Sequence, residues 1–257
     1  MVERRIPNPN VEGSSPSCPA TVFFMAYPGI PEDVLASLEE PDPLDLGLLT
    51  KEVAVFATPP DAPLQTLLHY GRLVLAGNQR MNLTGAKDWT TLIEAHFVDC
   101  LRAAQFLPDD VRTVADWGSG AGFPGILWSI LFPDKRFLLC EKRQKRVEFL
   151  EDVLMRLELF HAEVLPGQAQ EALRDEEDPV DALVARAVEP LPRFLARIRE
   201  NKVRFGALFL MAGPSWKQDW EGMSAKARSC WKLAAHHPYS LLGDRGKRHV
   251  LIFRPGS

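Results

Sequence analysis

The chain has 257 residues, of which 46% are hydrophobic and 25% are charged. This length suits one α/β domain with an extension, and the hydrophobic fraction is ordinary for a protein with a buried core. No apolar run approaches the roughly 20 residues that a membrane span needs, and the first residues lack the pattern of a secretory signal. The composition therefore argues against a membrane partner and against secretion.

The cysteine spacing and the net charge bear on metal binding, location and nucleic-acid binding. Four cysteines are scattered without a C-x-x-C pair: Cys18, Cys100, Cys140 and Cys230. Their spacing predicts neither zinc nor disulfides, so we expect no bound metal and a cytoplasmic protein. The net charge of −4 weakly disfavours a nucleic-acid binder, but Arg193 to Arg204 and Arg245 to Arg248 are basic runs that can hold phosphates.

The first 110 residues divide into a tail and a helical extension. Residues 1 to about 30 are rich in Pro, Ser and Asn, which predicts a poorly ordered tail. Residues 31–110 then predict a helical extension that caps the next domain. Its helices are expected at Pro31–Leu38, Leu44–Phe56, Pro63–Ala76 and Trp89–Phe106. Gly77-Asn78 should end the third helix, and Asn82-Leu83-Thr84 should form a polar turn.

Strand and helix patterns alternate over residues 111–257, which predicts an α/β fold with a mostly parallel sheet and helices on both faces. Seven strands are expected, the last two antiparallel: Thr113–Asp116, Arg136–Cys140, Ala162–Leu165, Val180–Ala187, Ala207–Met211, Trp231–His237 and Arg248–Phe253. The connecting helices are expected at Ile126–Phe132, Lys142–Leu159, Pro190–Glu200 and Trp216–Arg228, with a short one from Gly167. Lys145, Arg146 and Arg156 are predicted to form a solvated helix face.

The stretch Thr113–Gly125 reads as strand, glycine loop and helix, which is how a parallel sheet builds a nucleotide site. Gly118 and Gly120 belong to three alternating glycines, and Phe123 occupies the place of the third glycine in a dinucleotide fingerprint. Asp116 beside this loop would repel a pyrophosphate but attract the cation of an amino acid. The pattern acid-x-G-x-G-x-G resembles the first motif of class I S-adenosylmethionine methyltransferases.

Glu141 ends the second expected strand, about 20 residues past the loop, where an acid is placed to accept ribose hydroxyls. The alternative is a carboxylate that favours the start of the next helix. His96 and Asp99 share one helix face, and spacing alone favours a packing role for them. No nucleophile lies beside a general base at a recognisable spacing. That pattern is awkward for a hydrolase but compatible with methyl transfer to a neutral ring nitrogen, which mainly needs orientation.

Taken together, the motifs resemble one family, the bacterial RsmG (GidB) methyltransferases, from about His69 to the C-terminus. They are Asn82-Leu83-Thr84, His96 with Asp99, Asp116 to Gly125, Lys145-Arg146-Val147 with Phe149-Leu150, Ala185-Arg186-Ala187, Gly213-Pro214-Ser215 and Gly246-Lys247-Arg248-His249. The resemblance implies a Rossmann-like class I methyltransferase fold, with S-adenosylmethionine as cofactor. It further implies methylation of a guanine at N7 in 16S ribosomal RNA, presented as the small ribosomal subunit.

The resemblance also implies roles for individual residues. Those on the cofactor side would be Asp116, Gly118, Gly120, Phe123, Glu141, Ala169, Gln170 and Arg186. Of these, Glu141 would hold the ribose, and Ala169 with Gln170 would lie by the adenine. Positioning of the acceptor is expected from Asn82, His96, Asp99 and Arg186, with Arg248 and His249 also on the RNA side. No residue is expected to act as a chemical catalyst.

Other functions stay open at this stage. The family usually has a basic residue where Ala95 and Ala212 stand, which favours a methyltransferase of the same fold that acts on a small molecule or another RNA. A Rossmann dehydrogenase would need a tolerable third-glycine position, which Phe123 denies. A non-catalytic RNA-binding relative with a degenerate site would fail to bind S-adenosylmethionine.

Overall fold

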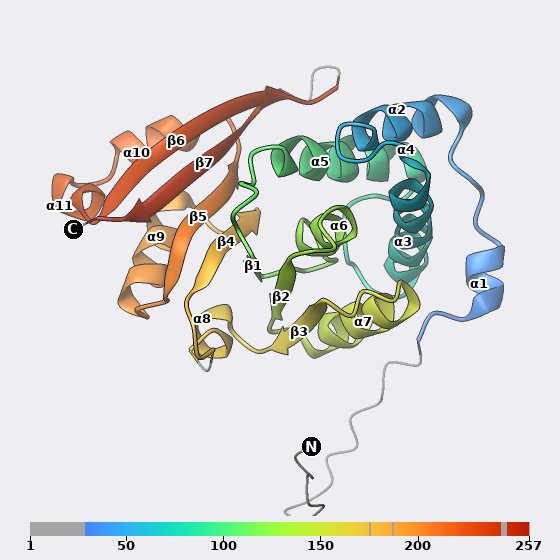
Figure 1. Cartoon of the computed structure of the whole chain (residues 1–257), viewed down its shortest axis with the longest axis horizontal. Helices are drawn as coiled ribbons and strands as arrows, with labels where there is room; N and C mark the ends of the chain where they lie inside the picture. Colours follow the sequence, from blue (N-terminus) through green and yellow to red (C-terminus); the bar gives the residue numbers. More distant parts are fainter. Residues whose placement is uncertain (1–28, 175, 187, 243–245, 257) are drawn as a thin grey trace, which may run out of the picture.

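The computed structural model describes residues 29–174, 176–186, 188–242 and 246–256 (Figure 1). The predicted N-terminal tail lies almost wholly outside the described residues, as does Ala187. Between residue 29 and the sheet lie six helical segments: α1 (Glu32–Ala36), α2 (Pro43–Val53), α3 (Asp61–Arg80), α4 (Trp89–Leu92), the π-helical turn η1 (Ile93–Phe97) and α5 (Val98–Ala104). In the part of the chain that the structure describes, no helix is both long and apolar enough to cross a membrane.

Seven strands form one sheet in the order β3-β2-β1-β4-β5-β7-β6. They are β1 (Thr113–Trp117), β2 (Arg136–Glu141), β3 (Ala162–Pro166), β4 (Val180–Arg186), β5 (Phe205–Ala212), β6 (Trp231–Ser240) and β7 (Lys247–Pro255). The first five are parallel, and β7 pairs antiparallel with both β5 and β6. This confirms the expected α/β fold. The strand order reverses between β1 and β4, and ligands of open α/β sheets bind at such a switch point.

Helices cover both faces of the sheet (Figure 1). The remaining ones are α6 (Gly125–Leu131), α7 (Gln144–Arg156), α8 (Ala169–Ala172), α9 (Leu191–Glu200), α10 (Trp216–Glu221) and α11 (Ala225–Ser229). One core is shared by the N-terminal helices, α6 and one face of the sheet, and it includes Leu67, Phe97 and Phe137. A second core lies under α8 and α9 and includes Phe194 and Leu208. The N-terminal helices therefore bury one face of the sheet.

The helix ends differ from the sequence prediction by a few residues in several places, and two of the differences change how the chain is divided into elements. Helix α3 continues through Gly77 and Asn78 to Arg80, because the Asn78 side chain bonds a later turn instead of ending the helix. Its Oδ1 accepts from the backbone N–H groups of Leu83 and Thr84 at 3.0 and 2.9 Å. The single helix expected over residues 216–228 is two helices, α10 and α11, since Ser224 begins the second and accepts from the Ala227 N–H at 3.2 Å.

Candidate cofactor site and a buried arginine cluster

The glycine loop follows β1 directly and is tied to the neighbouring strand. The backbone N–H groups of Gly118 and Ser119 both donate to the carbonyl of Cys140 at the end of β2, at 2.9 and 3.0 Å. Gly118 has φ +76°, a backbone conformation that residues with a side chain rarely adopt. Gly122, at φ +99°, also lacks room, since an added Cβ would lie 2.6 Å from Ile126 and 2.8 Å from the Tyr70 hydroxyl. The loop is therefore a fixed backbone surface.

Asp116 lies beneath this loop and is 1% exposed. Its Oδ2 accepts from the Gly125 N–H at the start of α6 at 3.0 Å, and its Oδ1 is buried without a hydrogen-bond partner. Burial raises the pKa of Asp116 to about 7. The residue supports the loop from below and is not among those lining the adjacent pocket. Its expected role toward the amino-acid cation of the cofactor stays a prediction.

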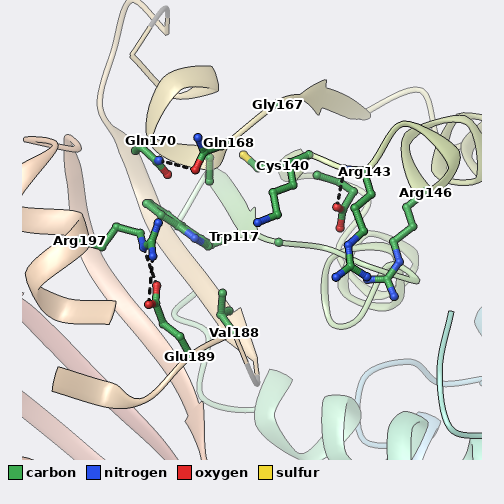
Figure 2. A pocket seen from close by; sticks show the side chains of 14 residues that line it. Trp117, Cys140, Arg143, Arg146, Gly167, Gln168, Gln170, Val188, Glu189 and Arg197 are labelled. Atoms are coloured by element: carbon green, nitrogen blue, oxygen red, sulfur yellow. Dashed lines mark hydrogen bonds and ion pairs between the residues drawn. The ribbon is translucent and has the colours of Figure 1, made fainter. Parts of the chain in front are cut away.

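A pocket of about 410 Å³ lies over the carboxyl ends of β1, β2 and β3 (Figure 2). This volume falls within the range of roughly 300–1,000 Å³ that is typical of small-molecule sites. Its walls are Trp117, Gly118, Cys140, Glu141, Lys142, Arg143, Arg146, Gly167, Gln168, Ala169, Gln170, Val188, Glu189 and Arg197. Figure 2 shows Arg143 and Arg146 on one side and the Arg197–Glu189 ion pair on another. The pocket thus combines backbone walls with a charged rim.

Two acids line this pocket, and one of them, Glu189, is paired with Arg197. The other, Glu141, lies at the end of β2 and is 5% exposed. Its Oε2 accepts from the Gly120 N–H at 3.0 Å and its Oε1 from the Arg143 N–H at 2.8 Å. Each carboxylate oxygen can accept more than one hydrogen bond. Glu141 therefore holds the glycine loop against the start of α7 and keeps acceptor capacity for a ligand.

Ala169 and Gln170 line the same pocket at the start of α8. The Gln170 amide nitrogen donates to the Gln168 side-chain oxygen at 3.0 Å, so its own amide oxygen is the group that can accept from a ligand. Of the expected cofactor residues, four line this pocket together: Gly118, Glu141, Ala169 and Gln170.

Arg186 ends β4 and belongs to a second assembly, which we call the arginine cluster: His96, Asp99, Phe123, Arg186 and Tyr239. Its Nη1 donates to Asp99 Oδ2 at 3.2 Å and its Nη2 bonds His96 Nδ1 at 2.5 Å. The hydroxyl of Tyr239 donates to Asp99 Oδ1 at 2.7 Å. The Arg186 and Asp99 side chains are only 15% and 9% exposed, so their charges compensate each other away from water.

Phe123 connects the cluster to the glycine loop. The His96 ring stacks on the Phe123 ring with centroids 5.2 Å apart and planes 9° apart. The guanidinium carbon of Arg186 lies 5.4 Å from the same ring centroid, a favourable placement for a cation. The structure thus brings together four of the residues expected around the acceptor and cofactor: His96, Asp99, Phe123 and Arg186.

The other expected RNA-side residues are not members of this cluster, although Arg248 neighbours its Tyr239 across two paired strands. The backbone carbonyl of Asn82 accepts from Arg146 Nη2 at 3.0 Å. Arg248 is opposite Tyr239 in the pairing of β6 with β7. His249 Nδ1 lies 2.7 Å from His236 Nε2, whereas His237 stacks on Phe106 on the opposite strand face.

Sequence reasoning named only four of the residues that line the pocket, and it missed Arg146 there and Tyr239 in the cluster. Arg146, expected on a solvated face, lines the pocket and bonds the Asn82 turn; its signal was the Lys-Arg-Val motif directly after the acid-ended strand. Tyr239 gave no signal, because its partner Asp99 is 140 residues away. Arg156 is only half-buried and pairs with Asp152 and Glu32, while Lys145 is exposed as predicted. Among the described residues no three His, Cys, Asp or Glu side chains are grouped to hold a metal ion.

The strand order and the glycine loop after β1 define a Rossmann-like α/β fold of the kind found in methyltransferases. The solved METTL16 MTase domain shares this fold, with a TM-score of 0.51 and 14% identity, over 81% of this chain and 91% of that one. The family model described as "rRNA small subunit methyltransferase G" (GidB) matches residues 63–250, and the chain belongs to this family.

Curated relatives carry the same family name, Ribosomal RNA small subunit methyltransferase G. One from Syntrophobacter fumaroxidans is 33% identical over 84% of this chain and 98% of its own length. One from Xanthomonas euvesicatoria is 32% identical over 87% of this chain and 96% of its own length. A shorter match to the Fusobacterium nucleatum protein is 36% identical and covers 50% of this chain and 55% of that one.

Proposed function

We propose that this protein transfers the methyl group of S-adenosylmethionine to N7 of a guanine in 16S ribosomal RNA. The observation that carries the proposal is the family match over residues 63–250, supported by relatives named as ribosomal RNA small subunit methyltransferases whose lengths are matched almost fully. Since the substrate is ribosomal RNA, we place the protein in the cytoplasm, where ribosomes assemble.

The pocket residues fit the cofactor by chemistry. Glu141 offers carboxylate oxygens at the end of β2, which suits the two ribose hydroxyls. The Gln170 amide oxygen and the apolar Ala169 suit the amino group and ring of adenine. The glycine loop at Gly118 provides backbone that the methionine part can approach closely. When bound, S-adenosylmethionine supplies an electrophilic methyl group.

The chain's own residues then need only to orient the acceptor. Guanine N7 carries a lone pair and no proton, so attack on the methyl group requires no general base. Arg186 lies at the end of β4, next to β1 at the switch point of the sheet, and its charge is balanced by Asp99. The arginine cluster is thus an ordered, nearly dry wall beside the loop that would hold the cofactor.

The basic rim of the pocket suits the RNA backbone. Lys142, Arg143 and Arg146 follow β2 and line the pocket. Arg143 and Arg146 lie on one side of it and Arg197 on another (Figure 2). Lys and Arg contacts to phosphates position an RNA without reading its sequence. We expect the binding of ribosomal RNA to weaken steeply with added salt, whereas binding of the cofactor changes little.

The test is transfer of labelled methyl from S-adenosylmethionine to small ribosomal subunits from a strain that lacks the corresponding gene. We expect label in 16S RNA at N7 of a guanine, mapped by chemical cleavage at 7-methylguanine. Label at another atom would refute the guanine N7 assignment, and label in no RNA would refute the substrate. Subunits from the parent strain, already methylated, are the matched control and should accept little label.

A further inference from the structure

A continuous chain of polar contacts runs from the sheet edge to the glycine loop. The Tyr239 hydroxyl on β6 donates to Asp99 Oδ1 on α5 at 2.7 Å. Asp99 Oδ2 accepts from Arg186 Nη1 on β4 at 3.2 Å. Arg186 Nη2 lies 2.5 Å from Nδ1 of His96 on η1, and His96 stacks on Phe123 of the loop. Side chains from four separate elements thus form one connected series of contacts.

The direction of the last contact follows from donor chemistry. A guanidinium has only donors, so His96 Nδ1 must accept the hydrogen bond from Arg186. An accepting Nδ1 carries no proton, and His96 therefore keeps its single proton on Nε2 and is neutral. Protonation of Nδ1 would set an imidazolium N–H against a guanidinium N–H, two donors and two cations face to face. The contact selects one tautomer of His96.

Tyr239 keeps this contact in place from the far end. Burial raises the pKa of Tyr239, with the Asp99 carboxylate adding to the effect, so the hydroxyl stays protonated and donates. Asp99 is buried and has one carboxylate oxygen for each partner. Without the hydroxyl, Oδ1 would lose the bond that fixes the carboxylate plane. Arg186 Nη1 also reaches the Cys100 sulfur at 3.4 Å, but a thiol cannot balance its charge as a carboxylate does.

We propose that Tyr239 is a positioning residue of this site, which acts through Asp99 and Arg186 to hold His96 as a neutral imidazole with its proton on Nε2. This rests on the proposed function for its purpose: the sulfonium cofactor is a cation, and a guanine methylated at N7 is one too. A protonated His96 stacked on the loop would repel both. These contacts keep the net charge of the cluster at zero, because Asp99 neutralises Arg186 and His96 stays neutral.

The direct test is nuclear magnetic resonance of the histidine ring nitrogens in the full chain at pH 7, with His96→Gln to assign the His96 signals. In the wild type we expect His96 to show protonated Nε2 and bare Nδ1. In Tyr239→Phe, which removes only the hydroxyl, we expect a mixture with the second tautomer or the cation. Unchanged His96 signals in Tyr239→Phe would overturn the proposal.

Phe106→Leu provides the matched control. Phe106 packs against the Tyr239 and His237 rings at 6.5 and 4.4 Å but takes no part in the polar chain. We expect this variant to loosen β6 and lower stability while His96 keeps its wild-type signals. If both variants change the His96 signals alike, packing and not the hydroxyl sets the tautomer, and the proposal fails.

Kinetics provide the second readout. We expect Tyr239→Phe to lower kcat about tenfold, from loss of one hydrogen bond to a charged group, with KM for S-adenosylmethionine nearly unchanged. In an Asp99→Asn background the same change should have almost no further effect, because the hydroxyl acts only through Asp99. Additive effects would overturn the proposal. The resonance experiment needs no substrate, so a wild-type protein that methylates no ribosomal RNA refutes the proposed function and leaves the tautomer assignment separately testable.

Discussion

Gly118 lines the pocket, while Phe123, five residues along the same loop, packs in the arginine cluster. The pocket side is held mainly by backbone groups, such as the Gly118 and Ser119 N–H groups on the Cys140 carbonyl. The cluster side is held by side chains that meet from distant parts of the chain. The difference indicates separate tasks: an open, fixed surface for a cofactor, and a nearly dry wall that orients an acceptor.

Removing the cation of the cluster should have the largest effect, and it should fall on stability. In Arg186→Ala the Asp99 carboxylate stays buried without its guanidinium, which typically costs about 3–5 kcal/mol. Urea unfolding followed by circular dichroism measures this loss. Arg193→Ala on the exposed side of α9 is the control and should change stability by less than about 0.5 kcal/mol. Equal losses in both variants would contradict a side-chain-held cluster.

On the pocket side, a change in the loop should affect ligand binding more than folding. Gly118→Asp places a side chain on a backbone at φ +76° and directs a carboxylate at the cofactor surface. The new Cβ would have room, because the nearest atom, in Val188, would lie 3.8 Å from it. We expect binding of S-adenosylmethionine to weaken by about 100-fold or more, from strain and obstruction together. Isothermal calorimetry measures the affinity.

The control for this loop change is Gly47→Asp, in an open position on α2 where nothing lies within 4 Å. It adds the same carboxylate away from the pocket and should bind the cofactor like the wild type. A Gly118→Asp protein that binds normally would show that the cofactor site lies elsewhere.

Much of the pocket side could be predicted from the sequence, because its parts are contiguous. The acid-ended strand, alternating glycines and following helix appear within Thr113–Leu131, and Glu141 follows one strand later. Each of these features depends on local backbone demands, which single residue types such as glycine reveal. Their binding roles remain predictions, but the structure does place Gly118, Glu141, Ala169 and Gln170 around one pocket.

The cluster side could not be predicted from spacing. Arg186 meets Asp99 across 87 residues and Tyr239 meets Asp99 across 140, and no local pattern records such pairs. His96 and Asp99 by themselves favoured a packing interpretation, and only the fold shows that a buried arginine joins them. The position of Arg146 could not be predicted for the same reason, because its side chain bonds the turn at Asn82, which is 64 residues away.

Asp116 lies beneath the loop that joins the pocket to the cluster, and its protonation tests whether water reaches the carboxyl there. The pKa in the folded state is raised to about 7, above the value of 3.8 expected in the unfolded chain. Between these values the folded state binds the extra proton, so stability falls as pH rises, by about 1.4 kcal/mol per pH unit, and the loss is complete above pH 7. Asp116→Asn removes this titration.

We therefore expect Asp116→Asn to gain stability relative to the wild type as pH rises from 5 to 7, with no further gain above pH 8. Urea unfolding of both proteins across this range measures the trend. The exposed Asp110→Asn shows how much of it a change of net charge alone produces. A difference between Asp116→Asn and wild type that is constant with pH would mean that water reaches the carboxyl beneath the loop.

The smallest effect is expected at Glu141, where ligand and loop share one carboxylate. In Glu141→Gln the amide oxygen can still accept from one N–H, but the amide nitrogen then faces the other donor, either Gly120 or Arg143. We expect S-adenosylmethionine affinity to fall about tenfold, the effect of one lost charge-assisted hydrogen bond. Methylthioadenosine, which keeps the ribose, should lose the same factor in calorimetry, and adenine should lose none.

Glu148→Gln on the exposed face of α7 is the matched control. If adenine binding falls as much as nucleoside binding, Glu141 acts through the shape of the loop and not through the ribose hydroxyls.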